Sequence, residues 1–229
     1  MCPADIAKVN NIKLSSDKSH YLLSVLRLKE GDNLEIIDGK GKAYNANIVS
    51  IVKNDVYVGI ASQIPVDTEP AVHIVLCQSI LKGDKMEIVI QKAVELGVSE
   101  IIPLITERCL VRTTRKTGRW RKIAEEAAEQ CCRAVVPFVH ESMTLNELSG
   151  QGKVNGFVFW EEGGSPPAGV APAHEKVYLL IGPEGGLAEN EVKTAESFGL
   201  IRTSLGKRVL RADTAAIVAL ALVQHMPVK

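Results

Sequence analysis

The sequence predicts an α/β protein in which a mostly parallel sheet follows a small antiparallel β-barrel domain. In the first third of the chain, short apolar stretches are joined by tight turns of Gly, Asn and Asp, which is typical of antiparallel hairpins. From Val72 onward, strand-sized apolar runs alternate with amphipathic helical patterns, and this alternation predicts βαβ units. Between the two parts, residues 63–70 hold two prolines around a polar stretch, as expected of a linker.

The first part is expected to contain one helix and three strands. The helix covers residues 16–28, with Ser15 or Ser16 as N-cap and Gly31 as the stop. The expected strands are 34–37, 43–52 and 56–60. A boundary after residue 68 divides the chain into a domain of residues 1–68 and a domain of residues 69–229.

The second part is expected to alternate strands with helices along its whole length. The expected strands are 72–77, 101–105, 135–140, 154–160, 176–181 and 201–205. The expected helices are 84–96, 119–132, 189–198 and 214–225.

Composition restricts the functions that the chain can have. The 27 Lys and Arg residues balance 27 Asp and Glu residues, so any nucleic-acid binding must come from a local basic patch. The five cysteines form no C-x-x-C pair and the histidines show no metal spacing, so we expect reduced thiols and no metal. Without a secretory signal or an apolar run long enough to span a membrane, we expect a cytoplasmic protein.

A glycine loop follows the expected strand 176–181, with the sequence Gly-Pro-Glu-Gly-Gly over residues 182–186. It matches neither of the usual phosphate-binding glycine motifs, and it carries Glu184 but no cation. A carboxylate there disfavours phosphate, but it can accept hydrogen bonds from ribose hydroxyls or an amine, or face a sulfonium. The alternative is a tight turn in which Glu184 caps a helix.

A second loop, residues 204–211, also leaves a strand and enters a helix. Asp213 or Thr214 is the expected N-cap of that helix. Arg211 either forms an ion pair with Asp213 or lies exposed to solvent. Both loops stand at the carboxyl ends of strands, where α/β sheets bind their ligands.

Basic residues gather in one short segment of the otherwise neutral chain. Seven of them lie within fifteen residues without an acid: Arg108, Arg112, Arg115, Lys116, Arg119, Arg121 and Lys122. Such a segment is suited to contacts with RNA phosphates, which position RNA without reading its sequence. A solvated charged surface is the alternative interpretation.

Several motifs together resemble a known family. They are residues 91–98 (QKAVELGV), 107–109 (ERC), 129–131 (EQC) with Arg133 and Pro137, 180–187 (LIGPEGGL), 205–206 (LG) with 209–211 (VLR), and, in the first part, 25–27 (VLR) and 38–39 (DG). In this order they resemble the RsmE family, which are small-subunit (16S) rRNA uracil-N3 methyltransferases of the SPOUT superfamily.

The resemblance implies a PUA-like β-barrel followed by a SPOUT domain whose C-terminal segment forms a trefoil knot. General topology rules alone predict an unknotted sheet. The resemblance also implies S-adenosylmethionine (SAM) as cofactor, a homodimer, and small-subunit rRNA or the 30S particle as partner.

The resemblance and the chemistry together assign candidate site residues. The expected cofactor-binding residues are Trp160, Leu180, Gly182, Pro183, Glu184, Gly185, Gly186, Leu205, Gly206, Val209, Leu210 and Arg211. The expected RNA contacts are Arg27, Arg108, Arg112, Arg115, Lys116 and Arg119. Arg133 and Arg211 are the candidate catalytic residues, as cations that stabilise negative charge on the uracil, and Gln91, Lys92 and Glu95 are candidates for orienting the base.

The sequence departs from the family pattern at two places. Asp213 stands where the family has Glu, and the N-terminus lacks an Arg–aromatic opening. The first departure leaves open an RNA-binding protein with an inactive methyltransferase domain, which would not bind SAM. A Rossmann-type nucleotide enzyme is the third hypothesis, and binding of NAD or ATP would indicate it.

Overall fold

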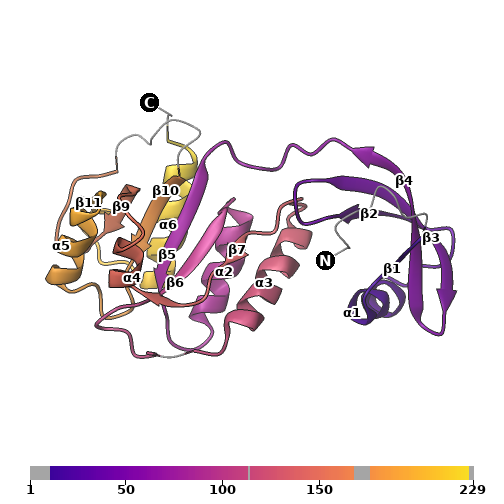
Figure 1. Cartoon of the computed structure of the whole chain (residues 1–229), viewed down its shortest axis with the longest axis horizontal. Helices are drawn as coiled ribbons and strands as arrows, with labels where there is room; N and C mark the ends of the chain where they lie inside the picture. The colour runs from indigo at the N-terminus through magenta and orange to yellow at the C-terminus, as the bar shows by residue number, and fades with distance from the viewer. Residues whose placement is uncertain (1–10, 113, 168–175, 227–229) are drawn as a thin grey trace. The chain divides into compact units, whose positions relative to one another are not determined.

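The computed structural model describes residues 11–112, 114–167 and 176–226 (Figure 1). The chain forms two compact units, which are Met1–Glu69 with Cys132–Val136, and Pro70–Cys131 with Pro137–Lys229. The return of residues 132–136 to the first unit has no counterpart in the expected division after residue 68. The N-terminal segment where the Arg–aromatic opening would stand lies outside the described residues.

The first unit is built on a four-stranded antiparallel sheet in the order β1-β4-β3-β2. Its strands are β1 (Ile12–Lys13), β2 (Asn33–Ile37), β3 (Ala43–Val52) and β4 (Asp55–Ile64). The expected hairpins are confirmed, and Lys53 and Asn54 form the β3–β4 turn with φ angles of 51° and 74°. Left-handed residues of this kind match the twist of a tight hairpin. The short strand β1 was not expected from the sequence.

The helix of the first unit is shorter than the sequence predicts. α1 (Ser16–His20) has Ser15 as its N-cap, and the Ser15 side chain accepts a hydrogen bond from the Lys18 amide at 3.4 Å. A π-helical turn, η2 (Tyr21–Val25), follows directly. The chain then turns at Arg27, which has a φ of 56°, and therefore the helix does not continue to residue 28.

The second unit contains a seven-stranded parallel sheet in the order β11-β9-β10-β5-β6-β7, with β8 also paired to β6. The strands are β5 (His73–Ser79), β6 (Glu100–Ile105), β7 (Phe138–Val139), β8 (Met143–Thr144), β9 (Asn155–Phe159), β10 (Lys176–Ile181) and β11 (Leu200–Thr203). This confirms the predicted α/β class. The expected strand 135–140 is reduced to β7, because residues 132–136 belong to the first unit.

Helices cover both faces of this sheet. On one face, α2 (Lys85–Glu95) packs between α3 (Thr117–Gln130) and α6 (Ala212–Gln224), and α6 contacts β5 and β10 (Figure 1). On the other face, α4 (Leu145–Ser149) and α5 (Glu189–Ser197) enclose a core with side chains of β5, β6, β9 and β10. A parallel sheet buried on both faces places its ligand sites at the carboxyl ends of the strands.

The trefoil knot implied by the resemblance stays a prediction. No helix in the described part of the chain is both long enough and apolar enough to cross a membrane.

Candidate functional site

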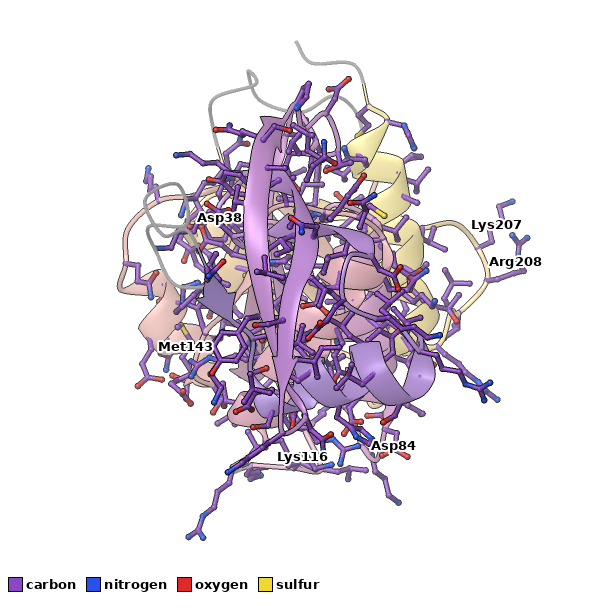
Figure 2. The ribbon with its side chains drawn as sticks, turned by 90° about the vertical axis from the view of Figure 1, so that its right-hand side faces the viewer. Asp38, Asp84, Lys116, Met143, Lys207 and Arg208 are labelled. Atoms are coloured by element: carbon purple, nitrogen blue, oxygen red, sulfur yellow. The ribbon has the colours of Figure 1, made fainter. Side chains whose placement is uncertain are left out.

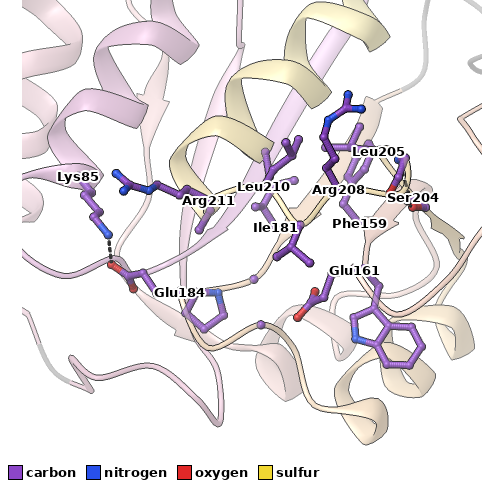
Figure 3. A pocket seen from close by; sticks show the side chains of 18 residues that line it. Lys85, Phe159, Glu161, Ile181, Glu184, Ser204, Leu205, Arg208, Leu210 and Arg211 are labelled. Carbon is purple, nitrogen blue, oxygen red and sulfur yellow. Dashed lines mark hydrogen bonds and ion pairs between the residues drawn. The ribbon is translucent and has the colours of Figure 1, made fainter.

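A pocket of about 530 Å³ lies in the second unit, where the chain leaves β9, β10 and β11 (Figure 3). Its size falls within the range of small-molecule sites in proteins. The lining residues are Lys85, Phe159, Trp160, Glu161, Ile181, Gly182, Pro183, Glu184, Gly186, Ser204, Leu205, Gly206, Arg208, Val209, Leu210, Arg211, Ala212 and Ala215. Apolar side chains, glycine backbone and five charged side chains therefore share one cavity.

The loop after β10 needs glycine at its turn. The Gly186 amide donates to the Pro183 carbonyl at 2.9 Å, and Gly186 has a φ of 72°. A Cβ on Gly186 would overlap the carboxylate of Glu161, so glycine leaves room for this acidic side chain beside the loop. From below, the buried Gln78 donates to the Gly182 carbonyl at 3.3 Å. The loop is thus anchored to β5 at Gly182 and turns sharply at Gly186.

The loop after β11 leads directly into α6. Arg211 has extended backbone angles and its carbonyl accepts from the Ala215 amide at 2.8 Å, which makes Arg211 the N-cap. The predicted N-cap at Asp213 or Thr214 is therefore wrong, because α6 begins two residues earlier, at Ala212. Asp213 sits in the first turn and accepts from the neighbouring Thr214 amide at 3.0 Å. It is not among the lining residues of the pocket.

Glu184 is paired, which the sequence did not indicate. Its Oε1 accepts from the Lys82 amide at 3.1 Å and from Lys85 Nζ at 3.2 Å. Desolvation raises the pKa of Glu184, but hydrogen bonds from its own amide, Lys82 and Lys85 outweigh it, and the pKa lies below its ordinary value. The loop itself carries no cation, as the sequence indicated, but in the folded chain α2 supplies one, Lys85.

Most of the predicted cofactor residues meet at this pocket. All of them line it except Leu180, which is buried in the sheet core, and Gly185, whose carbonyl accepts from Arg108 at 3.0 Å. The sequence reasoning missed Lys85, Phe159, Glu161, Ile181, Ser204, Arg208, Ala212 and Ala215. Apart from Lys85, these lie within a few residues of predicted positions, and their nearness was the available signal. Lys85 had no such signal, because it lies 99 residues from Glu184.

The two candidate catalytic arginines are not brought together at the pocket. Arg211 lines it, whereas Arg133 belongs to the first unit and is not among the lining residues. The Arg133 side chain is 4% exposed and donates to Glu69 from Nε at 3.3 Å and from Nη2 at 2.7 Å. In this single chain, the Arg133 guanidinium forms an ion pair with Glu69, which belongs to the same unit. Gln91, Lys92 and Glu95 also do not line the pocket, and Lys92 pairs with Glu95 at 2.8 Å.

The predicted RNA-contacting residues fall into two groups. Three make contacts within the protein, because Arg108 donates to Gly185, Arg112 to the Glu107 carbonyl at 2.9 Å, and Arg119 to Glu87 at 2.7 Å. Arg27, Arg115 and Lys116 are exposed. Figure 2 shows Lys116, and also Lys207 and Arg208 in the loop after β11, extending outward from the ribbon.

In the described residues, no group of three or more His, Cys, Asp or Glu is arranged to hold a metal ion.

Two protein-family models match the chain. One, described as an RNA methyltransferase domain, matches residues 68–224, and the other, described as an RNA methyltransferase PUA domain, matches residues 14–61. Among curated relatives, ribosomal RNA small subunit methyltransferase E of Buchnera aphidicola is 31% identical over 220 residues, covering 93% of this chain and 87% of that protein.

Solved structures agree with these matches. A ribosomal RNA small subunit methyltransferase E from Neisseria gonorrhoeae, bound to SAM, is 33% identical with a TM-score of 0.86, covering 93% of this chain and 90% of that one. A methyltransferase from Legionella pneumophila, also with SAM bound, is 36% identical with a TM-score of 0.80, covering 93% and 91%.

The parallel sheet, the pocket between glycine loops and the two family models define an RNA methyltransferase with an N-terminal PUA domain. Within that class, the chain belongs to the family of ribosomal RNA small subunit methyltransferase E.

Proposed function

We propose that this protein transfers the methyl group of SAM to N3 of a uridine in small-subunit rRNA. The observation that carries the proposal is the pocket between the loops after β9, β10 and β11, in a chain that is 33% identical to a SAM-bound relative over most of its length. The uridine N3 specificity rests on the family.

The residues present fit SAM. Ile181, Leu205 and Leu210 offer apolar surface for an adenine ring, while Glu161 offers a carboxylate to ribose hydroxyls or to the positive groups of the ligand. The space that a Cβ on Gly186 would fill lies beside Glu161, so the loop keeps that carboxylate accessible. When bound, SAM supplies an electrophilic methyl group on a sulfonium, and S-adenosylhomocysteine is left after transfer.

The protein's own residues must align the base and favour loss of the N3 proton. Alignment alone contributes effective molarities of about 10⁵ M or more. Arg211 lines the pocket and is placed to stabilise negative charge as it develops on the uracil. The geometry of the single chain does not support the same role for Arg133, whose guanidinium is bonded to Glu69.

For RNA, we propose that exposed cations hold the phosphate backbone. Arg115 and Lys116 precede α3, and Arg27 lies in the PUA domain. Replacing Arg115 and Lys116 together by Ala should weaken binding and reduce the dependence of log K on log[salt] by about 0.9 per lost contact. An unchanged salt slope would contradict this role.

We also propose a homodimer that acts in the cytoplasm, where small subunits are assembled. Apolar side chains remain partly exposed on α6 and in the loop before it, with Leu222 44% and Val209 80% exposed. Sedimentation analysis tests the dimer, and we expect Leu222→Glu to yield monomers.

The two alternative functions gain no support from the pocket. Its lining gives no reason to favour a Rossmann-type enzyme, and Asp213, which stands where the family has Glu, is not among the lining residues.

Methyl transfer to purified 30S subunits, followed by mass spectrometry of the rRNA, tests the function. With 30S subunits from cells lacking the gene, we expect the protein to add one N3-methyluridine to the small-subunit rRNA. In rRNA taken directly from cells, we expect this nucleotide to be absent when the gene is removed and present again when the gene is returned. Calorimetry tests the pocket separately, and we expect Gly186→Ala to weaken SAM binding. Gly118→Ala is the matched control, because a Cβ on Gly118 meets no atom within 4 Å. A wild-type protein that binds no SAM would favour the inactive RNA-binding alternative.

A further inference from the structure

One end of the pocket holds two cations around a single carboxylate. Lys85, the first residue of α2, places Nζ 3.2 Å from Glu184 Oε1, and both residues line the pocket with Arg211. Figure 3 shows Lys85, Glu184 and Arg211 at the same end, while Phe159, Leu205 and Ser204 lie at the other. Arg208 points away from this group (Figure 3). One end of the pocket therefore has two cations, Lys85 and Arg211, beside Glu184, and the other end combines apolar Phe159 and Leu205 with Glu161 and Arg208.

The proposed reaction needs positive charge on the side of the acceptor base. Uracil N3 attacks as its proton leaves, and negative charge then spreads over N3 and the two carbonyl oxygens. Preorganised hydrogen-bond donors aimed at such charge are among the largest contributions to catalysis. At the other end the one cation, Arg208, points away from the Lys85 group, and Glu161 adds a negative charge. The end with Lys85 and Arg211 therefore fits the uracil, and the end with Phe159 and Leu205 fits an adenine ring.

Glu184 is poorly suited to act as a general base that removes the N3 proton of the uracil. Desolvation raises the pKa of Glu184, but the hydrogen bonds from its own amide, Lys82 and Lys85 lower it by more, and the net pKa lies below the ordinary value. Glu184 is therefore a weak base at neutral pH. Its hydrogen bond instead orients the Lys85 ammonium at the pocket wall. The Lys85 side chain is 38% exposed, so a substrate can reach Nζ.

We infer, on the basis of the proposed function, that Lys85 is a substrate-contacting catalytic residue whose ammonium donates a hydrogen bond to a carbonyl oxygen of the target uracil. The N3–H electron pair forms the new N–C bond, the N3 proton passes to water, and the electrons of the broken S–C bond remain on sulfur. Lys85 keeps its proton throughout and stabilises the oxygen on which charge accumulates. Glu184 holds Lys85 in place before the base arrives.

The test compares Lys85→Met with Lys82→Met on reconstituted 30S subunits at saturating SAM. Lys82 is the matched control, because its backbone amide, not its side chain, bonds to Glu184. We expect the single-turnover rate to fall about 10²–10³-fold for Lys85→Met, as for the loss of one oxyanion donor, and to stay near wild type for Lys82→Met. Calorimetry should show SAM affinity within about threefold of wild type for both variants, a difference well under 1.4 kcal/mol.

A second substrate separates charge stabilisation from a structural role. In rRNA transcribed with 5-fluorouridine, N3–H is more acidic, so less help is needed from a cation. We expect this substrate to restore a large part of the Lys85→Met rate. A wild-type rate in Lys85→Met, a loss of SAM affinity equal to the loss of rate, or no rescue by 5-fluorouridine would each overturn the inference. If the wild-type enzyme methylates no small-subunit rRNA, the proposed function itself fails, and that result is distinct from the others.

Discussion

The carboxylate of Glu69 accepts two hydrogen bonds from the guanidinium of Arg133, at 3.3 Å from Nε and 2.7 Å from Nη2. Glu69 Oε1 also accepts from the Val135 amide at 3.3 Å. These bonds tie the returning segment, residues 132–136, to the end of the first unit's continuous segment, Met1–Glu69. An arginine that sequence motifs suggest for catalysis therefore has a structural contact that accounts for its burial.

Glu69→Gln should destabilise the protein, because it replaces a charged partner of the buried Arg133 guanidinium by a neutral amide. We expect a loss of about 2 kcal/mol in urea denaturation. Asp67→Asn, an exposed change in the same linker, is the control and should have no measurable effect. Arg133→Lys tests the alternative, since lost methyl transfer with full stability would return Arg133 to a catalytic role.

Glu191 joins the residue before the basic segment to the end of the loop between β10 and α5. This buried carboxylate accepts from the Glu107 amide at 2.8 Å and from the Ala188 amide at 3.0 Å. In Glu191→Gln, the amide NH₂ faces a backbone N–H, so one hydrogen bond is lost. We expect a cost of about 1–2 kcal/mol in unfolding free energy.

Glu189→Gln is the matched control for that experiment. Glu189 lies on the same helix, and its ion pair with Lys193 is about two-thirds exposed on both sides. We expect the control to change stability by less than about 0.5 kcal/mol. Equal losses in the two variants would show that Glu191 has no special role.

Arg27 combines an unfavourable backbone with an exposed guanidinium. Its φ of 56° lies in the left-handed region, which costs a non-glycine residue about 1 kcal/mol. We therefore expect Arg27→Gly to be about 0.5–1 kcal/mol more stable than Arg27→Ala by thermal denaturation. If Arg27 contacts a phosphate, both variants should bind rRNA equally weakly, and different affinities would argue against that contact.

Glu100 makes stability depend on acidic pH. Its carboxylate bonds to Lys176 at 2.5 Å, to His140 at 2.8 Å and to His73 at 2.9 Å. Desolvation raises its pKa, but these three bonds outweigh it and bring the pKa to about 2 from an ordinary 4.5. Because the folded pKa is depressed, the stabilisation is complete above pH 4.5 and is lost as pH falls toward 2.

The measurement is the free energy of unfolding of wild type and Glu100→Gln between pH 7 and pH 2. We expect the variant to be about 2 kcal/mol less stable at pH 7, with a difference that shrinks on acidification. A constant difference across this range would show that Glu100 acts through packing rather than through its charge.

Local patterns in the chain were enough to predict the α/β class, most helices and strands, and the two glycine loops of the pocket. This is understandable, because hydrophobic periodicity, caps and turn glycines act between residues close in sequence. The prediction failed at two helix ends. The N-cap of α6 is Arg211 rather than Asp213 or Thr214, and the first helix ends before Arg27 rather than at residue 28.

Pairing between charges required the folded chain. Lys85 meets Glu184 only because β5 and β10 are neighbours in the sheet, and Glu69 meets Arg133 only because residues 132–136 return to the first unit. Charged partners this far apart in sequence cannot be recognised from hydrophobic periodicity or from short motifs. The position of a charged side chain in the pocket, and whether its charge is already neutralised, therefore follow from strand order and loop packing.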